Sequence, residues 1–583
     1  MRKIQIIVVA LLVLLLPGSS VAFTAGDHSL DQSLEKSIQR LMRKQHLPGL
    51  AITIVEDQEI LYQEAFGIAD LENNIGATTG TVFRWWSVSK MFTALEIFRE
   101  VEEGLAGLDD PLDKYLPEFT IQSRSDEEQP VTVKSILAHR SGLPRNECST
   151  PPEARAVSPW LKKFEMCTAG CFKAFPEGTR YHYSNLGYDL LGRIIEENRH
   201  EGFAPYMKKQ LFEELGMENT AFSSADISDS LTLARGYEFY KGKYYPVIRP
   251  DITSVPSGNL YSTIEDMSLF LKSVFGQRIF ASGETMAHMF EDHYSSPDDP
   301  ETMGLGWKTT RLDGTELLAW HDGGPDDGDG ALVAILPSRK LGIALIGNGT
   351  SLSGSISLPF AMEIFQELTD PERESAGSHS CVKEKLKNRE HPLEDYEGTY
   401  TAFGQLLQVK ARKSKLKGKI GGLSLEMIPV NDSTFRVTHW MDKLGLTKII
   451  KPPIEFNKIH ITFCNGRVPG SRNMIINLDN ITYEICPRYP DRLIEEGGWE
   501  KLAGDYRMAE RLPGNRPGAY TSNIFSISTV DHTLVMSGPF GPIVPVDDHC
   551  LQILSGPFAG ETMEYDPANG NLVHQDAVFI PVT

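Results

Sequence analysis

The order of the apolar patterns along the first 370 residues most constrains the fold of this chain. An amphipathic helix is expected at residues 30–45, followed by two strand-like runs at Leu50–Val55 and Glu59–Gly67. Helical patterns begin at Ser87 and recur through the middle of the chain. Before a closing helix at Ser357–Leu368, strand patterns return at Gly304–Thr309, Glu316–Trp320, Gly330–Leu336 and Leu341–Gly347. Strands at both ends of a helical middle predict an α+β fold, with helices packed on one antiparallel sheet built from both ends.

Beyond residue 370 the pattern changes. Residues 371–392 are rich in charged and small side chains, so we interpret them as a linker that follows a domain at 23–370. Short alternating strands dominate after the linker, which predicts an all-β C-terminal part. Two stretches there start alike, Leu393-Glu-Asp-Tyr-Glu-Gly-Thr-Tyr and Trp499-Glu-Lys-Leu-Ala-Gly-Asp-Tyr. This weak repeat favours two β-domains, at 393–492 and 493–583, and one larger barrel is the alternative. The basic stretch Lys410–Lys419 is interpreted as a solvated hairpin.

The first 22 residues have the features of an export signal. Arg2 and Lys3 precede an apolar run at Ile4–Leu16, and the small residues Ser19, Ser20 and Ala22 follow it. The run is shorter than the about 20 apolar residues that a membrane-spanning helix needs. We therefore expect a protein outside the cytoplasm, periplasmic or secreted, with no membrane span after cleavage at 1–22. An uncleaved N-terminal anchor is the alternative.

The net charge and the cysteine content limit the classes of partner and metal that the chain is expected to bind. A net charge of −21 repels phosphate backbones, so nucleic-acid binding is not expected. Seven cysteines in 583 residues do not make a disulfide scaffold, although one disulfide among Cys148, Cys167 and Cys171 is plausible after export. Cys167 and Cys171 have no matching second pair for a zinc site. No metal and no cofactor are expected.

The tetrapeptide Ser87-Val88-Ser89-Lys90 carries the clearest chemistry. A serine hydroxyl becomes a nucleophile when a neighbouring base takes its proton, and a lysine three residues later on a helix returns to the same face. Burial can lower the pKa of that lysine enough to leave the amine neutral. The same spacing also occurs at Ser33/Lys36, Ser380/Lys383 and Ser414/Lys417, so the context of each pair has to decide.

Two further segments supply that context. Tyr183-Ser184-Asn185 offers a proton shuttle in Tyr183 and, in Asn185, an amide to orient the lysine and the substrate; the bland alternative is a buried tyrosine with a capping asparagine. Ser257-Gly258-Asn259 is a rival polar triplet. In His321-Asp322-Gly323-Gly324 the glycines allow a substrate to approach a strand edge and leave the Gly324 N–H as an oxyanion donor, the alternative being a plain hairpin turn.

Together these motifs resemble those of the penicillin-recognising serine hydrolases, the group of class C beta-lactamases, D-alanyl-D-alanine carboxypeptidases, D-aminopeptidases and related esterases. Leu108–Glu118, Ile136–Pro144 and Gly258–Asp266 are similar too, and the resemblance covers about residues 30–370. It implies a beta-lactamase/transpeptidase-like fold and an acyl-enzyme mechanism. In that mechanism Ser87 attacks, Lys90 and Tyr183 move protons, the Ser87 and Gly324 N–H groups form the oxyanion hole, and water deacylates.

The third motif departs from that family pattern. Beta-lactamases and carboxypeptidases carry a lysine followed by threonine or serine there, which bind the substrate carboxylate, whereas this chain has His321 and Asp322. A neutral histidine and an anionic aspartate make a poor carboxylate receptor, and Asp326, Asp327 and Asp329 add negative charge. We therefore expect Asp322 and Gly323 to contact a substrate with a neutral ester or amide, or with a free ammonium group.

The function predicted from the sequence is that of an exported serine hydrolase. It would act on an ester or amide of a small or peptide-like substrate, as a D-aminopeptidase or esterase rather than a true beta-lactamase. One alternative is a cell-envelope binding or sensor protein that acylates slowly or not at all. Another is an interaction protein that works through its β-domains. D-aminopeptidases of this family resemble this layout, with β-barrels after the catalytic domain that shape the site. A stability or attachment role for the β-domains is at least as consistent with the sequence.

Overall fold

The computed structural model of the chain describes residues 28–123, 129–145, 172–369 and 391–581, apart from segments within the last two ranges, of which 439–458 and 509–523 are the longest. The predicted signal at 1–22, most of the linker at 371–392, the cysteines 148, 167 and 171, and the aspartates 326, 327 and 329 lie outside the described residues. Residues up to Lys44 form a unit of their own, whose described part is the amphipathic helix α2 (His28–Lys44). Within the described part of the chain, no helix combines the length and the apolar character needed to cross a membrane.

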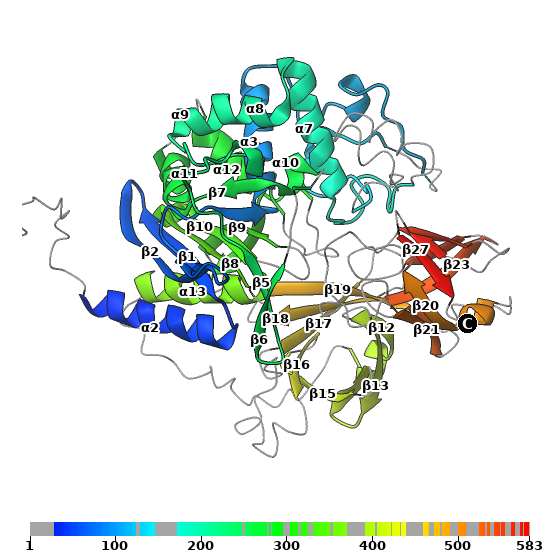
Figure 1. Cartoon of the computed structure of the whole chain (residues 1–583). Helices are drawn as coiled ribbons and strands as arrows, with labels where there is room; N and C mark the ends of the chain where they lie inside the picture. Colours follow the sequence, from blue (N-terminus) through cyan, green and yellow to red (C-terminus); the bar gives the residue numbers. More distant parts are fainter. Residues whose placement is uncertain are drawn as a thin grey trace, which may run out of the picture. The chain divides into compact units, whose positions relative to one another are not determined.

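An antiparallel sheet forms the centre of the α+β domain, by which we mean β1 to α13 (Figure 1). Three of its strands come from the start of this domain and four from its end, and they meet where β1 pairs with β11, Leu50 opposite Gly347. The predicted fold class is thus confirmed, with the sheet built from both ends. In spatial order the strands are β3 (Ile75–Gly76), β2 (Glu59–Asp70), β1 (Gly49–Glu56), β11 (Leu341–Gly347), β10 (Gly330–Leu336), β9 (Glu316–Gly323) and β8 (Lys308–Leu312).

Both faces of the central strands are covered. Helix α11 (Ile264–Gly276) packs against β1 and β11, and α13 (Gly354–Thr369) packs against β9, β10 and β11. Figure 1 shows the two helices on opposite sides of the sheet. For this reason every residue of β10 and β11 is buried and the two strands are apolar throughout instead of alternating.

The helical part fills the middle of the chain. Helix α3 (Ser89–Glu102) runs through its core, and each of its residues from Ser89 to Phe98 is buried. The helix ends two residues before Gly104, whose φ of +76° suits glycine, as the sequence predicts. The other elements here are α4 (Val133–Leu137), α7 (Asn185–Arg199), α8 (Phe203–Met207), α9 (Glu213–Leu215), α10 (Val255–Gly258), α12 (Gly283–Phe290), and the strand pairs β4 (Phe83–Trp86) with β7 (Leu260–Ser262) and β5 (Gly236–Tyr240) with β6 (Lys243–Val247).

Two details differ from the sequence patterns. Helix α3 (Ser89–Glu102) begins after Ser87, which lies in the turn that joins β4 to the helix. The strand expected at Gly304–Thr309 begins only at Lys308, because Gly304 and Leu305 instead bond the backbone of Trp307 and Met289. As a result, Ser87 lies shortly before the first residue of α3, and Lys308 is the first residue of β8.

Two closed barrels follow residue 393 in the described part of the chain. Each has its own apolar core, centred on Tyr396 and Phe463 in one and on Tyr506 and Met536 in the other. The first barrel contains β12 (Gly398–Ala402), β13 (Gln405–Arg412), β14 (Lys415–Ile420), β15 (Leu423–Pro429), β16 (Thr434–Thr438), β17 (Ile459–Asn465), β18 (Arg472–Leu478) and β19 (Ile481–Tyr489). The second contains β20 (Gly504–Met508), β21 (Ile524–Val530), β22 (Thr533–Met536), β23 (Gly541–Asp547), β24 (Cys550–Ile553), β25 (Thr562–Tyr565), β26 (Leu572–His574) and β27 (Ala577–Pro581).

The two similar stretches noticed in the sequence occupy equivalent places in the barrels. Each forms a short 3-10 turn that leads into the first strand of its barrel. In each, a tyrosine hydroxyl donates to the backbone carbonyl four residues earlier at 3.1 Å, Tyr400 to Tyr396 and Tyr506 to Leu502. This shared contact gives the weak repeat a physical basis.

A buried ionic cluster joins α3 to α7. The Arg199 guanidinium bonds Glu96 at 3.0 Å and Glu100 at 3.1 Å, and both carboxylates are fully buried. Burial raises the pKa of Glu100 to about 7, although hydrogen bonding from Asn198 and the charge of Arg199 oppose the rise. Because the pKa is raised on folding, the stabilisation from neutral Glu100 is complete below its ordinary pKa of 4.5 and is lost as the pH rises through about 7.

We predict that Glu100→Gln removes this pH dependence, because the amide stays neutral at every pH. Between about pH 5 and pH 8, the wild type should lose on the order of 1–3 kcal/mol of unfolding free energy relative to the variant. Thermal unfolding followed by circular dichroism across this range measures the difference. The exposed neighbour Glu103, which also bonds Arg199, supplies the control Glu103→Gln. Parallel curves for wild type and Glu100→Gln would contradict the prediction.

Candidate active site

Ser87 lies in a tightly held turn between β4 and α3. It is the one residue between Thr81 and Phe98 that is not buried, so its hydroxyl is open to a ligand while its neighbours are fixed. Trp86, just before it, has a φ of +49°, a left-handed conformation that a bulky residue adopts only at a cost. The Ser89 hydroxyl donates to the Trp86 carbonyl at 2.5 Å, and the Arg84 guanidinium covers the Trp86 ring at 3.8 Å. These contacts hold the turn that presents Ser87.

Lys90 points back at Ser87 from the first turn of α3. Its Nζ lies 3.4 Å from the Ser87 hydroxyl and donates at 2.7 Å to both the Asn185 side-chain carbonyl and the Ser257 backbone carbonyl. The side chain is fully buried, and this burial holds the pKa of Lys90 well below its ordinary value. The charge of Asp189 opposes the shift, whereas the charges of Arg145 and Lys308 add to it. The arrangement is that of an amine prepared to accept a proton from Ser87.

Tyr183 completes the group around the Ser87 hydroxyl. The two hydroxyls are hydrogen-bonded, and the Lys90 Nζ lies 4.7 Å from the centre of the Tyr183 ring. Burial raises the pKa of Tyr183, so the phenol keeps its proton at neutral pH. His139 stacks at a tilt on Tyr183 with 4.3 Å between ring centres, and its Nδ1 accepts from the Ser184 N–H at 3.1 Å. This geometry would allow Tyr183 to relay a proton between Ser87 and a neighbouring group.

Strand β9 brings the third motif to the same place. A Cβ on Gly323 would lie 2.1 Å from the Trp85 carbonyl oxygen and 3.2 Å from the Ser87 nitrogen. Only glycine therefore lets the strand approach the turn that contains Ser87. Gly324 follows the strand and is exposed. His321 is fully buried, and its Nδ1 lies 2.7 Å from the Asp322 carbonyl oxygen, a geometry that makes Nδ1 the donor. Burial first, then the charge of Lys308, lowers the pKa of His321 to about 3, so the ring is neutral.

Asp322 has a partner that sequence reasoning missed. The Lys308 ammonium, on the neighbouring strand β8, bonds the Asp322 carboxylate at 2.6 Å and lies 5.9 Å from the Tyr183 ring centre. Although burial opposes it, the attraction of Lys308 is strong enough that the pKa of Asp322 is lowered. The anionic charge expected from the sequence is therefore paired. No motif marks Lys308; only its register opposite Trp320 of β9 brings it to this edge.

The structure thus gathers all eight residues predicted for the site around the β4–α3 turn, the start of α7 and the end of β9. Sequence reasoning also missed Arg145, whose guanidinium lies 5.1 Å from the Tyr183 ring centre, and Asp189 on α7. The rival triplet at 257–259 is part of the same site, since the Ser257 carbonyl holds Lys90. The exposed pair Ser414/Lys417 lies instead in the basic stretch, which forms the β13–β14 hairpin.

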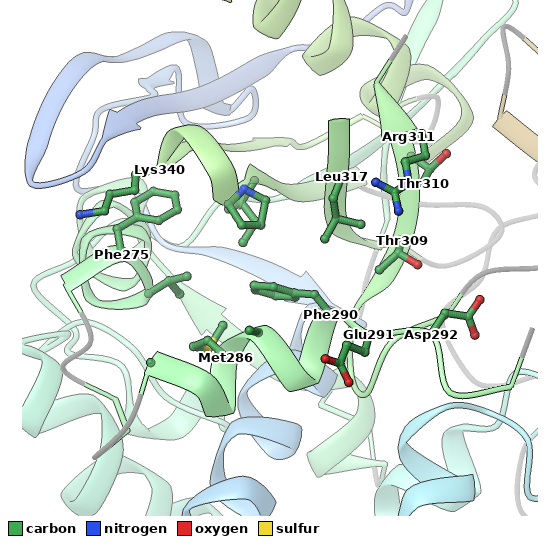
Figure 2. A pocket seen from close by; sticks show the side chains of 15 residues that line it. Phe275, Met286, Phe290, Glu291, Asp292, Thr309, Thr310, Arg311, Leu317 and Lys340 are labelled. Carbon is green, nitrogen blue, oxygen red and sulfur yellow. The ribbon is translucent and has the colours of Figure 1, made fainter. Parts of the chain in front are cut away.

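A separate cavity of about 670 Å³ lies between α11, α12 and the β8–β10 side of the sheet (Figure 2). Phe275, Met286, Phe290 and Leu317 give it an apolar wall, and Glu291, Asp292, Arg311 and Lys340 are charged residues of its lining. None of the eight predicted site residues lines this cavity. Its volume alone therefore does not locate the chemistry of the protein.

Comparison with known proteins identifies the family of the chain. A profile described as Beta-lactamase matches residues 34–358, more than half of the chain. The chain belongs to the beta-lactamase family. The matched residues include all three motifs, among them His321-Asp322-Gly323, whose glycine permits close approach to the Ser87 turn. The profile and the relatives described below fit the penicillin-recognising serine hydrolase superfamily.

Two named relatives each match about half of the chain. "Protein flp" of Staphylococcus aureus (strain N315) is 25% identical over 320 residues, which is 54% of this chain and 63% of the relative. "Beta-lactamase-like protein 2" of Dictyostelium discoideum is 28% identical over 253 residues, 41% of this chain and 44% of the relative. The matched part thus spans less than two thirds of either relative.

Solved structures show the same fold. The octameric penicillin-binding protein homologue from Pyrococcus abyssi is similar with a TM-score of 0.51 and 23% identity, over 79% of this chain and 100% of that one. The crystal structure of SurE gives a TM-score of 0.54 and 20% identity, over 80% of this chain and 100% of that one. At these identities the likeness supports the fold alone.

The charges around Lys90 predict opposite pH shifts for two variants. Lys308→Met removes a positive charge and leaves Asp322 unpaired, so both changes favour protonated Lys90 and should move its titration to higher pH. Asp322→Asn should move it to lower pH, each by roughly one pH unit or less. The rate at which a fluorophosphonate probe modifies Ser87, measured against pH, reports this titration. Lys340→Met, which breaks the exposed pair with Asp57, is the control and should cause no shift. Shifts of the same sign in both site variants would contradict the assignment.

Proposed function

We propose that this protein is an exported serine hydrolase that cleaves an ester or amide bond through an acyl-enzyme formed on Ser87. The observation that carries the proposal is the position of the buried Lys90 amine. Its nitrogen lies 3.4 Å from the accessible Ser87 hydroxyl and is held by the Asn185 side-chain oxygen and the Ser257 carbonyl. A neutral amine in that position activates a serine as a nucleophile. The family match and the features of residues 1–22 support the hydrolase class and the export, respectively.

In the proposed first half-reaction, the Ser87 oxygen forms a bond to the substrate carbonyl carbon and its proton passes to Lys90. The carbonyl oxygen becomes an oxyanion that the Ser87 and Gly324 N–H groups would stabilise. When the bond to the leaving alcohol or amine breaks, the proton returns to that group. Tyr183 is suited to carry it, because its hydroxyl is bonded to Ser87 and its raised pKa keeps it protonated.

The second half-reaction uses water in place of the leaving group. A water molecule gives a proton to the same Lys90 and Tyr183 pair and attacks the acyl carbon. The bond to the Ser87 oxygen then breaks, and the proton returns to Ser87, so the enzyme is regenerated with release of an acid. Asn185 holds Lys90 at 2.7 Å through both steps and keeps the amine directed at Ser87.

The pairing of Asp322 with Lys308 bears on the substrate. As long as the pair is closed, neither charge is available as a strong receptor, which supports a neutral ester or amide as the reacting group. A substrate carboxylate would have to compete with the Asp322 carboxylate for Lys308 at close range. We therefore propose a D-aminopeptidase-like or esterase-like activity rather than hydrolysis of carboxylate-bearing antibiotics as the main reaction.

We predict that Ser87→Ala abolishes turnover, with a loss of about 10³-fold or more, because no other nucleophile replaces Ser87. A panel of a nitrophenyl ester, a D-alanine anilide and a penicillin would be followed by released chromophore and by intact protein mass. The matched control is Ser414→Ala, which removes the serine of an exposed Ser-x-x-Lys pair. A lasting adduct on Ser87 without turnover would instead identify a sensor that acylates but does not hydrolyse. If the wild type gives no turnover and forms no adduct with any member of the panel, the proposal is overturned for these substrate classes.

We also predict that Asp322→Thr raises turnover of carboxylate-bearing substrates relative to neutral ones. The variant removes a negative charge and frees Lys308, and two unit charges about 4 Å apart interact by ~1–4 kcal/mol, so a gain on the order of tenfold is expected. The ratio of kcat/KM for a carboxylate ester to that for its methyl ester measures the effect. Asp57→Thr breaks a comparable exposed pair with Lys340 and should leave the ratio unchanged. An unaltered ratio in Asp322→Thr would refute the charge argument.

A further inference from the structure

The second barrel places a carboxylate beside the catalytic segment. Glu561 immediately precedes β25, and its side chain is 5% exposed. One of its oxygens, Oε1, accepts from the Arg145 backbone N–H at 2.6 Å and lies 3.3 Å from the His182 Nε2. Both partners belong to the α+β domain, more than 370 residues earlier in the chain. A buried carboxylate is costly unless it is hydrogen-bonded, so these contacts are a defined feature of the fold.

Arg145 connects this carboxylate to two residues of the proposed mechanism. Its backbone carbonyl accepts from the Asn185 N–H at 2.7 Å, at the first residue of α7. Its guanidinium lies 5.1 Å from the centre of the Tyr183 ring. Glu561 thus holds Arg145, the residue against which Asn185 and Tyr183 are placed, and Asn185 in turn holds Lys90.

His182 provides a second connection to the same segment. It directly precedes Tyr183, and its own N–H donates to the His139 carbonyl at 2.8 Å while its ring reaches Glu561. His139 also accepts from the Ser184 N–H and packs on Tyr183. The segment 182–185 is therefore fixed from one side by residues 139–145, and Glu561 contacts both segments, at His182 and at Arg145.

We propose that Glu561 is a positioning residue for the active site, through which the second barrel holds Arg145 and His182 and so fixes Tyr183 and Asn185 around Lys90. The kinetic consequence rests on the proposed hydrolase function, whereas the structural contact does not. In this view the second barrel is part of the catalytic apparatus rather than an attachment or stability module. A small displacement of Asn185 or Tyr183 would misdirect Lys90, and misplacement by about 1 Å can cost on the order of 10²-fold in rate.

The test uses the full chain with Glu561→Ala, the conservative Glu561→Gln, and Glu394→Ala as an exposed control in the first barrel. We expect Glu561→Ala to lower kcat for the ester about tenfold or more, with a smaller change in KM. Glu561→Gln retains an acceptor for the Arg145 N–H and should recover most of the rate. Unchanged kcat in a folded Glu561→Ala variant would overturn the proposal.

A double-mutant cycle separates positioning from a general loss of stability. If Glu561 acts through the segment that holds Asn185, then Glu561→Ala should change the rate less than about threefold in an Asn185→Ala background. Independent, multiplicative losses would overturn the assignment.

Hydrogen exchange tests the contact without any activity. We expect the Arg145 amide to be protected in the wild type and exposed in Glu561→Ala, with protection kept in Glu394→Ala. Rapid exchange of this amide in the wild type would overturn the contact itself, even if Glu561→Ala fails to fold. If Ser87 proves unreactive while the Arg145 amide is protected, the proposed hydrolase function fails and the barrel contact stands.

Discussion

The burial of the Lys90 amine is the constraint on which the rest of the site depends. An ammonium group removed from water is strongly disfavoured, and this lowers the pKa of Lys90 and favours the neutral amine that the proposed mechanism requires. The same burial demands acceptors, which are supplied by Asn185 at the start of α7 and by the Ser257 carbonyl of α10. Three elements distant in sequence must therefore meet at one nitrogen, and the packing of α3 against α7 and α10 makes that meeting possible.

The charges around this amine balance one another. Arg145 and Lys308 disfavour its protonated form, while Asp189 and Asp322 favour it, and Lys308 and Asp322 are themselves an ion pair. The carboxylate that the sequence places at Asp322 is consequently not an isolated charge, because Lys308 on the adjacent strand neutralises it. Such a pair can set the proton affinity of Lys90 and the charge preference of the site together.

Several parts of the fold could be predicted from the sequence because their determinants are local. Apolar runs marked β1, β10 and β11, and the order of strands and helices predicted a sheet built from both ends. The start of α3 was placed two residues early, since periodicity does not register the left-handed Trp86 that turns the chain. Ser87-Val-Ser-Lys90 and Tyr183-Ser-Asn185 were recognisable because the nucleophile, base and shuttle lie within short segments.

What the sequence alone determined was therefore the chemistry of short motifs and the class of fold, both of which depend on spacing along the chain. What only the tertiary structure decided was which distant groups share one site. Lys308 reaches Asp322 through strand register, Arg145 lies over Tyr183 through loop packing, and Glu561 comes from a barrel at the far end of the chain. Hydrogen bonds and ion pairs act over a few ångströms in space, and no local pattern encodes which residues, hundreds of positions apart, the folded chain brings within that distance.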